Sequence, residues 1–150
     1  MREFTREKRL RTRSVAGTLA LGEIITELLP APKLVVLRGE LGAGKTTLVK
    51  GMAAALGAAN AEEVTSPTFT LVHEYQGKKV RLFHLDLYRL ETEQELEGIG
   101  LWEMADAADA LVVVEWGEKF ASVMERADAE VAMEQGENET ERVLLVRWRD

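Results

Sequence analysis

Apolar side chains recur along the first third of the chain with two different periods. After Ser14, which suits the position before a helix, they return at roughly helical spacing as far as Leu29, and Pro30 follows directly. Residues 33–38 instead hold four consecutive apolar side chains between breakers, a pattern typical of a strand buried on both faces of a parallel sheet. The pattern therefore predicts a helix over residues 15–29 and a central strand over 33–38.

A glycine-rich loop follows this strand and leads into a second helix. The loop covers residues 39–44, and helical spacing then runs from Lys45 to Leu56. Gly57 comes directly afterwards, at the position where glycine ends many helices in a left-handed conformation. These elements predict the start of a strand–helix–strand core.

The rest of the chain predicts mainly strands joined by turns. Short strand-like runs lie at residues 4–10, 69–76, 79–87, 111–115, 129–134 and 142–149. The first resembles a charged edge strand, the 111–115 run is apolar enough to be buried on both faces, and the other four pair as two hairpins. Thr92 and Glu95 form a capping box, which predicts a short acidic helix. The whole chain, residues 1–150, is predicted to be one domain with antiparallel additions to its core.

Length and composition narrow the class of protein. The chain has 150 residues, the size of one domain, and no cysteine, which excludes disulfide scaffolds, zinc–thiolate sites, iron–sulfur clusters and thiol catalysis. No apolar run approaches the roughly 20 residues of a membrane helix, and the N-terminus lacks the apolar run of a secretory signal. We therefore expect a cytoplasmic protein that does not bind membranes.

The net charge of −7 is unevenly distributed along the chain. Residues 1–13 carry six basic and two acidic side chains, a net charge of +4, and the remaining residues carry −11. The acidic body argues against broad binding of a nucleic-acid backbone. The basic N-terminus either contacts phosphate or forms a solvated edge strand, and the acidic run 91–109 is either a solvated face or a docking surface for a basic partner.

The strongest chemical signal is the segment Gly39-Glu-Leu-Gly-Ala-Gly-Lys-Thr46, which matches the P-loop pattern G-x-x-x-x-G-K-[ST]. Glycines let successive backbone N–H groups turn toward phosphate oxygens, and the following helix adds the positive end of its dipole. Lys45 supplies a charge for the β- and γ-phosphates, and Thr46 supplies a hydroxyl for Mg²⁺. The residues expected at the nucleotide are Glu40, Leu41, Gly42, Ala43, Gly44, Lys45, Thr46 and Thr47.

A P-loop needs a carboxylate partner for the magnesium ion, because Mg²⁺ prefers hard oxygen ligands. Glu115 ends a buried strand, as a Walker B acid does, although that acid is usually aspartate, and Asp86 ends another strand-like run. If the two apolar strands are parallel, their C-terminal ends lie beside the phosphate loop. We expect Thr46, Glu115 and Asp86 at the metal, and Lys45, Asp86 and Glu115 in catalysis. A surface position is the alternative for each carboxylate.

Several further residues carry weaker signals. The hydroxyl-rich segment 65–70 is either a turn into a strand or a loop that senses the γ-phosphate. His84 shares a strand face with Asp86, so it either helps to order the site or is a polar residue satisfied elsewhere. Arg89 either reaches phosphate or pairs with a nearby acid. Trp116 follows the strand-end glutamate directly and should lie near the nucleotide.

Four segments form a specific combination in this order along the chain. They are Gly39-Glu-Leu-Gly-Ala-Gly-Lys-Thr-Thr47, Ser66-Pro-Thr-Phe-Thr70, His84-Leu-Asp-Leu-Tyr-Arg89 and Val114-Glu-Trp-Gly117. Together they closely resemble the TsaE (YjeE) family, the bacterial ATPase of tRNA threonylcarbamoyladenosine synthesis, over residues 17–118. The resemblance implies a P-loop NTPase-like three-layer α/β fold, with a mainly parallel central sheet and flanking antiparallel strands.

The same resemblance implies roles for particular residues and partners. Lys45 and Thr46 would bind ATP phosphate and Mg²⁺, Glu115 would be a Walker B-like magnesium carboxylate, and Asp86 would lie at the metal or the attacking water. The resemblance also favours residues 66–70 and Arg89 as part of the site. The family works with TsaB and TsaD, which carry out carbamoyl transfer to a tRNA adenosine, so tRNA would be acted on by the complex rather than bound mainly by this chain.

Three functions fit these observations, and an ATPase is the one that the sequence favours. No acid directly follows Glu115, so Asp86 acts as the base or hydrolysis stays slow until a partner completes the site. A nucleotide-sensing docking module, in which turnover is incidental, would use the same residues. A small-molecule P-loop kinase is less favoured, because residues 90–125 contain no arginine for a lid over the phosphates.

Overall fold

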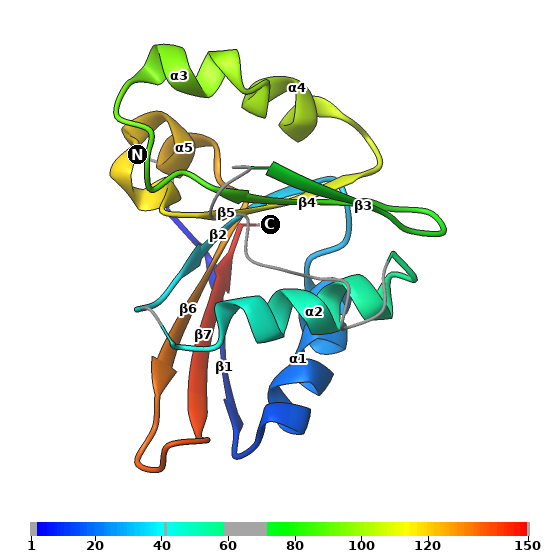
Figure 1. The fold of residues 1–150 in the computed structure, drawn as a ribbon, viewed down its shortest axis with the longest axis vertical. Helices are drawn as coiled ribbons and strands as arrows, with labels where there is room; N and C mark the ends of the chain where they lie inside the picture. Colours follow the sequence, from blue (N-terminus) through cyan, green and yellow to red (C-terminus); the bar gives the residue numbers. More distant parts are fainter. Residues whose placement is uncertain (1–2, 41, 59–71, 150) are drawn as a thin grey trace.

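A seven-stranded sheet in the order β1-β7-β6-β2-β5-β4-β3 forms the centre of the protein (Figure 1). The computed structural model describes residues 3–40, 42–58 and 72–149. The strands are β1 (Arg6–Thr12), β2 (Lys33–Arg38), β3 (Val72–Gln76), β4 (Arg81–Asp86), β5 (Ala110–Glu115), β6 (Ala129–Gln135) and β7 (Arg142–Trp148). Strands β6, β2, β5 and β4 are parallel, whereas β1, β7 and β3 pair antiparallel at the two sides. The predicted mainly parallel sheet with antiparallel flanks is thereby confirmed.

Helices cover both faces of this sheet and give the molecule three layers (Figure 1). One face carries α1 (Val15–Leu28) and α2 (Lys45–Ala55). The other carries α3 (Glu93–Gly98), α4 (Leu101–Asp106), the 3-10 helix η2 (Gly117–Lys119) and α5 (Ala121–Arg126). The sequence of β5 is apolar at every position before Glu115 because the strand is buried on both faces. Leu111 and Val113 pack toward α1 and α2, and Val112 and Val114 pack into the opposite core.

The capping signals in the sequence fix the ends of three helices as predicted. Ser14 accepts a hydrogen bond from the backbone N–H of Gly17 at 2.9 Å and begins α1. Gly57, with φ of 69°, follows α2, where the N–H of Ala58 donates to the carbonyl of Ala53 at 2.8 Å. Thr92 and Glu95 form both bonds of a capping box at the start of α3.

Helices α1 and α2 approach each other closely because glycine lies at their contact. A Cβ on Gly51 would come within 2.0 Å of the carbonyl oxygen of Leu19, and a Cβ on Gly22 within 2.4 Å of the backbone of Gly51. These distances leave no room for any side chain at either position. The crossing therefore sets the position of α2, whose first turn contains Lys45 and Thr46.

The C-terminal hairpin differs from the antiparallel addition that the sequence predicts. Strand β6 enters the sheet beside β2 and runs parallel to it, and β7 then joins β6 to the edge strand β1. The strand leading to the P-loop is therefore held between β5 and β6. Helices α4 and α5 are not predicted by the sequence pattern either. Within the described residues, no helix combines the length and apolar character needed to cross a membrane.

Candidate functional site

The glycine-rich loop connects the C-terminal end of β2 to the first turn of α2, as the sequence predicts. Gly42 and Gly44 have φ angles of 84° and 101°, in the left-handed region that favours glycine. The N–H of Ala43 donates to the carbonyl of Glu40 at 3.0 Å, which closes a turn within the loop. Leu41, also expected at the nucleotide, lies outside the described residues. Lys45 begins α2 directly after this turn.

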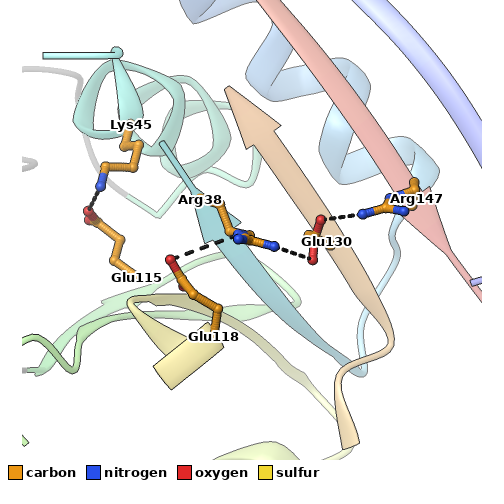
Figure 2. A network of polar contacts seen from close by, with 6 residues as sticks. All are labelled: Arg38, Lys45, Glu115, Glu118, Glu130 and Arg147. Carbon is orange, nitrogen blue, oxygen red and sulfur yellow. Dashed lines mark hydrogen bonds and ion pairs between the residues drawn. The ribbon is translucent and has the colours of Figure 1, made fainter. Parts of the chain in front are cut away.

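Lys45 and Glu115 form an ion pair at the mouth of the loop (Figure 2). The Nζ atom of Lys45 lies 3.2 Å from Oε1 of Glu115, and both side chains are largely buried. Glu115 reaches this place because β5 is parallel to β2, in a register that sets it beside Leu37. The parallel arrangement therefore brings the strand-end carboxylate to the P-loop lysine, as expected from the sequence.

His84 holds the other oxygen of the same carboxylate. Its Nε2 atom lies 2.6 Å from Oε2 of Glu115, and the imidazole is completely buried. Because an ionised carboxylate only accepts, Nε2 carries the hydrogen and donates it. Among the described atoms, Nδ1 of His84 is buried without a hydrogen-bond partner. The sequence leaves two roles open for His84. These contacts support the role in which its side chain helps to order the site.

These contacts set the ionisation of Glu115. Burial raises the pKa of the carboxyl group, but hydrogen-bonded and electrostatic interactions with His84 and Lys45 outweigh that effect. The pKa of Glu115 therefore lies below its ordinary value. The site presents a fixed, ionised carboxylate directly beside a lysine ammonium group.

Asp86 lies next to Glu115 across the β4–β5 pair, where the two residues are direct partners in register. Residues paired in this way project from the same face of the sheet. Asp86 is half-buried, and its Oδ1 accepts a hydrogen bond from the N–H of Tyr88 at 2.9 Å. The β4 and β5 ends thus bring together the two acids that the sequence marks as candidates.

The donor set suits a magnesium ion that is shared with a bound phosphate. Among the described residues, no group of three histidine, aspartate and glutamate side chains is arranged to hold a metal by itself. Mg²⁺ usually keeps several waters and binds one or two carboxylates together with phosphate oxygens. Glu115, Asp86 and the hydroxyl of Thr46, in the first turn of α2, provide hard oxygen donors of this kind.

An aromatic ring borders the lysine, and a second ring lies beside the first. Nζ of Lys45 lies 5.5 Å from the ring centroid of Trp116, and the Tyr88 ring lies 5.1 Å from the Trp116 ring. Trp116 has φ of 64°, an unusual conformation for a bulky residue, and it turns the chain sharply after β5. Trp116 is therefore near the P-loop lysine, and its predicted place near the nucleotide stays a prediction, while Tyr88 is 62% exposed.

An open cavity of about 630 Å³ adjoins the outer side of the loop. Its lining comes from the end of β2, the loop, the segment after β5 and the end of β6: Arg38, Gly39, Glu40, Gly42, Ala43, Trp116, Glu118, Ala132, Met133, Glu134 and Gln135. A chain of ion pairs lies at its border. Arg38 contacts Glu118 at 3.8 Å and Glu130 at 3.5 Å, and Arg147 contacts Glu130 at 2.8 Å (Figure 2).

Sequence reasoning missed one residue that contacts the loop, Arg142. It begins β7, and its Nε and Nη2 groups donate to the carbonyl oxygens of Ala43 at 2.7 Å and Gly42 at 3.2 Å. These partners are about a hundred positions apart in the chain, and no local pattern around Arg142 signals the contact. Two weaker candidates remain open: residues 65–70 lie outside the described parts of the chain, and Arg89 is exposed.

Comparisons with known proteins bear on this site. The profile of the family described as "Threonylcarbamoyl adenosine biosynthesis protein TsaE" matches residues 12–144. A tRNA threonylcarbamoyladenosine biosynthesis protein TsaE from Nostoc is 45% identical over 69% of this chain, although the match spans only 64% of the Nostoc protein. The protein of the same name from Mycobacterium tuberculosis is 36% identical over 89% of this chain and 83% of its own.

A solved structure agrees with these matches. The crystal structure of YdiB from Bacillus subtilis superposes with a TM-score of 0.74 and 25% identity, covering 99% of this chain and 90% of that one. The family profile spans most of the chain and includes the P-loop, His84, Asp86 and Glu115. On these matches, the chain belongs to the TsaE family of threonylcarbamoyl adenosine biosynthesis proteins.

Proposed function

We propose that this chain binds Mg-ATP on its P-loop and hydrolyses it, in support of the TsaB–TsaD complex that forms threonylcarbamoyladenosine on tRNA. The observation that carries the proposal is the Lys45–Glu115 ion pair, held by His84 beside the left-handed glycines of the loop. A buried lysine and a buried carboxylate at this place match the two charges that a nucleotide and its metal ion require.

Arrival of the nucleotide would exchange the partners of Lys45. Its ammonium group would turn from Glu115 toward the β- and γ-phosphates, while loop N–H groups bind phosphate oxygens. Glu115 would then be released toward the metal ion, with its second oxygen still held by His84. Mg²⁺, when bound, offsets charge on the phosphate oxygens. Thr46, Glu115 and Asp86 are the residues that would hold it.

Asp86 is the group best suited to orient the attacking water. Its carboxylate is half-buried and adjoins Glu115 in register, so it borders the phosphate side of the site. Phosphoryl transfer depends more on positioning and charge stabilisation than on a strong base. The absence of an acid directly after Glu115 is consistent with turnover that is slow until a partner protein completes the site.

The test is Mg²⁺-dependent phosphate release from ATP, for the protein alone and with TsaB, TsaD and tRNA. Lys45→Ala should abolish ATP binding or turnover, because it removes the charge that meets the β- and γ-phosphates. Glu115→Ala should impair Mg²⁺-dependent turnover. Lys50→Ala, on the same helix beyond the loop, is the matched control and should leave both unchanged. Hydrolysis that persists unaltered in both site variants would overturn the assignment.

A nucleotide-dependent docking module is the second candidate, and the aromatic border of the site favours it. Tyr88 is largely exposed and packs at a tilt against Trp116, which in turn contacts Lys45, so nucleotide binding at Lys45 would change an accessible surface. In that case, TsaD binding should follow ATP occupancy in Asp86→Asn, a substitution that removes the candidate base. Modified tRNA would still form without hydrolysis.

A further inference from the structure

The Arg142 guanidinium group is surrounded by backbone carbonyl groups. Besides the bonds to Ala43 and Gly42, its Nη1 group donates to the carbonyl oxygens of Glu139 at 2.6 Å and Glu141 at 2.9 Å. The cation therefore joins the P-loop to the turn of the C-terminal hairpin. The planar guanidinium presents donors in fixed directions, which is why one side chain can bind four carbonyl groups at once.

No described carboxylate forms an ion pair with Arg142. Arg38, Arg81, Arg126 and Arg147 each have an acidic partner. Among the described residues, the acceptors of its guanidinium are carbonyl oxygens, and its positive charge lies directly behind the loop. A neighbouring phosphate would be attracted by this charge, because the site is partly shielded from water.

The bonds to Arg142 also fix the direction of a loop amide. In a trans peptide, the C=O and N–H groups point in opposite directions. The 2.7 Å bond that pulls the carbonyl of Ala43 toward Arg142 therefore turns the N–H of Gly44 the opposite way, away from the guanidinium. A charged donor on the carbonyl also polarises the peptide, which makes that N–H a stronger donor.

Packing keeps the loop against this support. A Cβ on Gly44 would lie 3.5 Å from Nε of Arg142 and 3.5 Å from the terminal methyl carbon of Met133, which is buried on β6. The back of the loop thus rests on the β6–β7 hairpin. Its support comes from a different part of the chain than Lys45, His84 and Glu115.

We propose that Arg142 is a positioning residue for phosphate: it orients and polarises the Gly44 amide and supplies a positive charge behind the P-loop. The proposal rests on the nucleotide binding proposed above, and Arg142 acts through the loop without touching phosphate itself. Lysine would keep the charge but could not bind the carbonyls of Ala43 and Gly42 in the same fork. Glutamine would lose both the charge and most of the bonds.

The first measurement is the Kd for Mg-ATP of the wild type, Arg142→Gln and Arg142→Lys, each checked by circular dichroism to be folded. We expect Arg142→Gln to weaken binding about tenfold, the equivalent of one charge-assisted hydrogen bond, with Arg142→Lys in between. Arg147→Gln, on the same strand but bonded to Glu130, is the matched control. It removes an equal charge and should leave the Kd within about twofold. An unchanged Kd in folded Arg142→Gln overturns the proposal.

A second measurement tests the loop without nucleotide. In ¹⁵N-labelled protein, Arg142→Gln should shift the Gly44 amide resonance, whereas Arg147→Gln should leave it unchanged. A Gly44 amide unaffected by Arg142→Gln overturns the inference, even if ATP binds. If wild-type protein fails to bind ATP, the proposed function fails, and the Gly44 amide alone decides whether Arg142 orients the loop.

Discussion

Glu115 has both carboxylate oxygens engaged by nitrogen atoms, one by Lys45 and the other by His84. Burial raises the pKa of this carboxyl group, but the two partners lower it by more, so the pKa lies below the ordinary value of 4.5. A carboxylate with a lower pKa in the folded state stabilises the protein at pH values above its unfolded pKa. That contribution is lost as the pH falls through the folded pKa.

We therefore expect the pH dependence of folding stability to change in Glu115→Gln. The stability of the wild type relative to this variant should be largest at neutral pH and should fall as the pH drops below about 4.5. Urea unfolding at a series of pH values measures the difference. Asp109 and Glu95 also have lowered pKa values, but they titrate in both proteins, so their contributions cancel in the stability difference. A difference that stays constant or grows in acid would contradict the lowered pKa.

At the residue scale, the sequence predicts the roles of residues in local motifs better than the roles of residues whose partners are distant in the chain. Lys45 and Glu115 stand in recognisable sequence patterns, so their meeting follows once the strands are parallel. His84 stays ambiguous in the sequence because its partner comes from a neighbouring strand 31 positions away. Arg142 carries no local signal, since its contacts depend on where the hairpin joins the sheet.

The contact between α1 and α2 links helix packing to the position of the P-loop. Gly51→Ala should destabilise the protein by about 1–3 kcal/mol, because the added methyl group would overlap the backbone carbonyl of Leu19. Since Lys45 starts the same helix, ATP affinity should fall as well. Chemical denaturation and ATP titration measure the two effects.

Gly98→Ala is the matched control for this substitution. Gly98 lies in α3, and a Cβ there meets nothing within 4 Å. Alanine should stabilise the protein by about 0.4–1 kcal/mol, because it restricts the unfolded chain. Equal effects of the two substitutions would show that the α1–α2 crossing tolerates a side chain.

At the element scale, two of the helices that the sequence predicts are marked by capping side chains, and α2 is marked by the glycines before and after it. Ser14 and Thr92 mark the starts of α1 and α3 through bonds from their own side chains. Helices α4 and α5 have six residues each, and their N-cap residues, Gly100 and Phe120, form no side-chain cap. Packing of a buried residue from each helix against the sheet defines them, and that packing is not visible in the local sequence.

Across the whole molecule, the ion pairs around Glu130 connect β2, β6 and β7. Glu130 is only 2% exposed, and its carboxylate is paired with both Arg38 and Arg147. Glu130→Gln should lower the free energy of unfolding by about 1–3 kcal/mol; partial exposure of both arginines limits the loss. Glu134→Gln, an exposed position on the same strand, should change it by less than about 0.5 kcal/mol. Equal stability of the two variants in thermal or urea unfolding would refute the contribution of this network.

The order of the strands is the part of the fold that the sequence predicts least. Apolar runs identify β2 and β5 as buried, and turn residues identify the hairpins. No local sequence pattern predicts that β6 inserts beside β2 and runs parallel to it, because this pairing joins segments nearly a hundred residues apart. The cavity beside the loop and the support from Arg142 both follow from that insertion.

This insertion also has a consequence for the time at which the protein matures on the ribosome. Strand β2 and the P-loop are synthesised before their neighbours β5 and β6, which emerge only with residues 110–115 and 129–135. Until then, the apolar β2 has no pairing partner in the sheet, and Arg142 is added later still. A nascent chain stalled before Arg142 would expose unpaired strands and invite chaperone binding. Any stabilisation of folding by the ligand would therefore begin only after Arg142 has been synthesised.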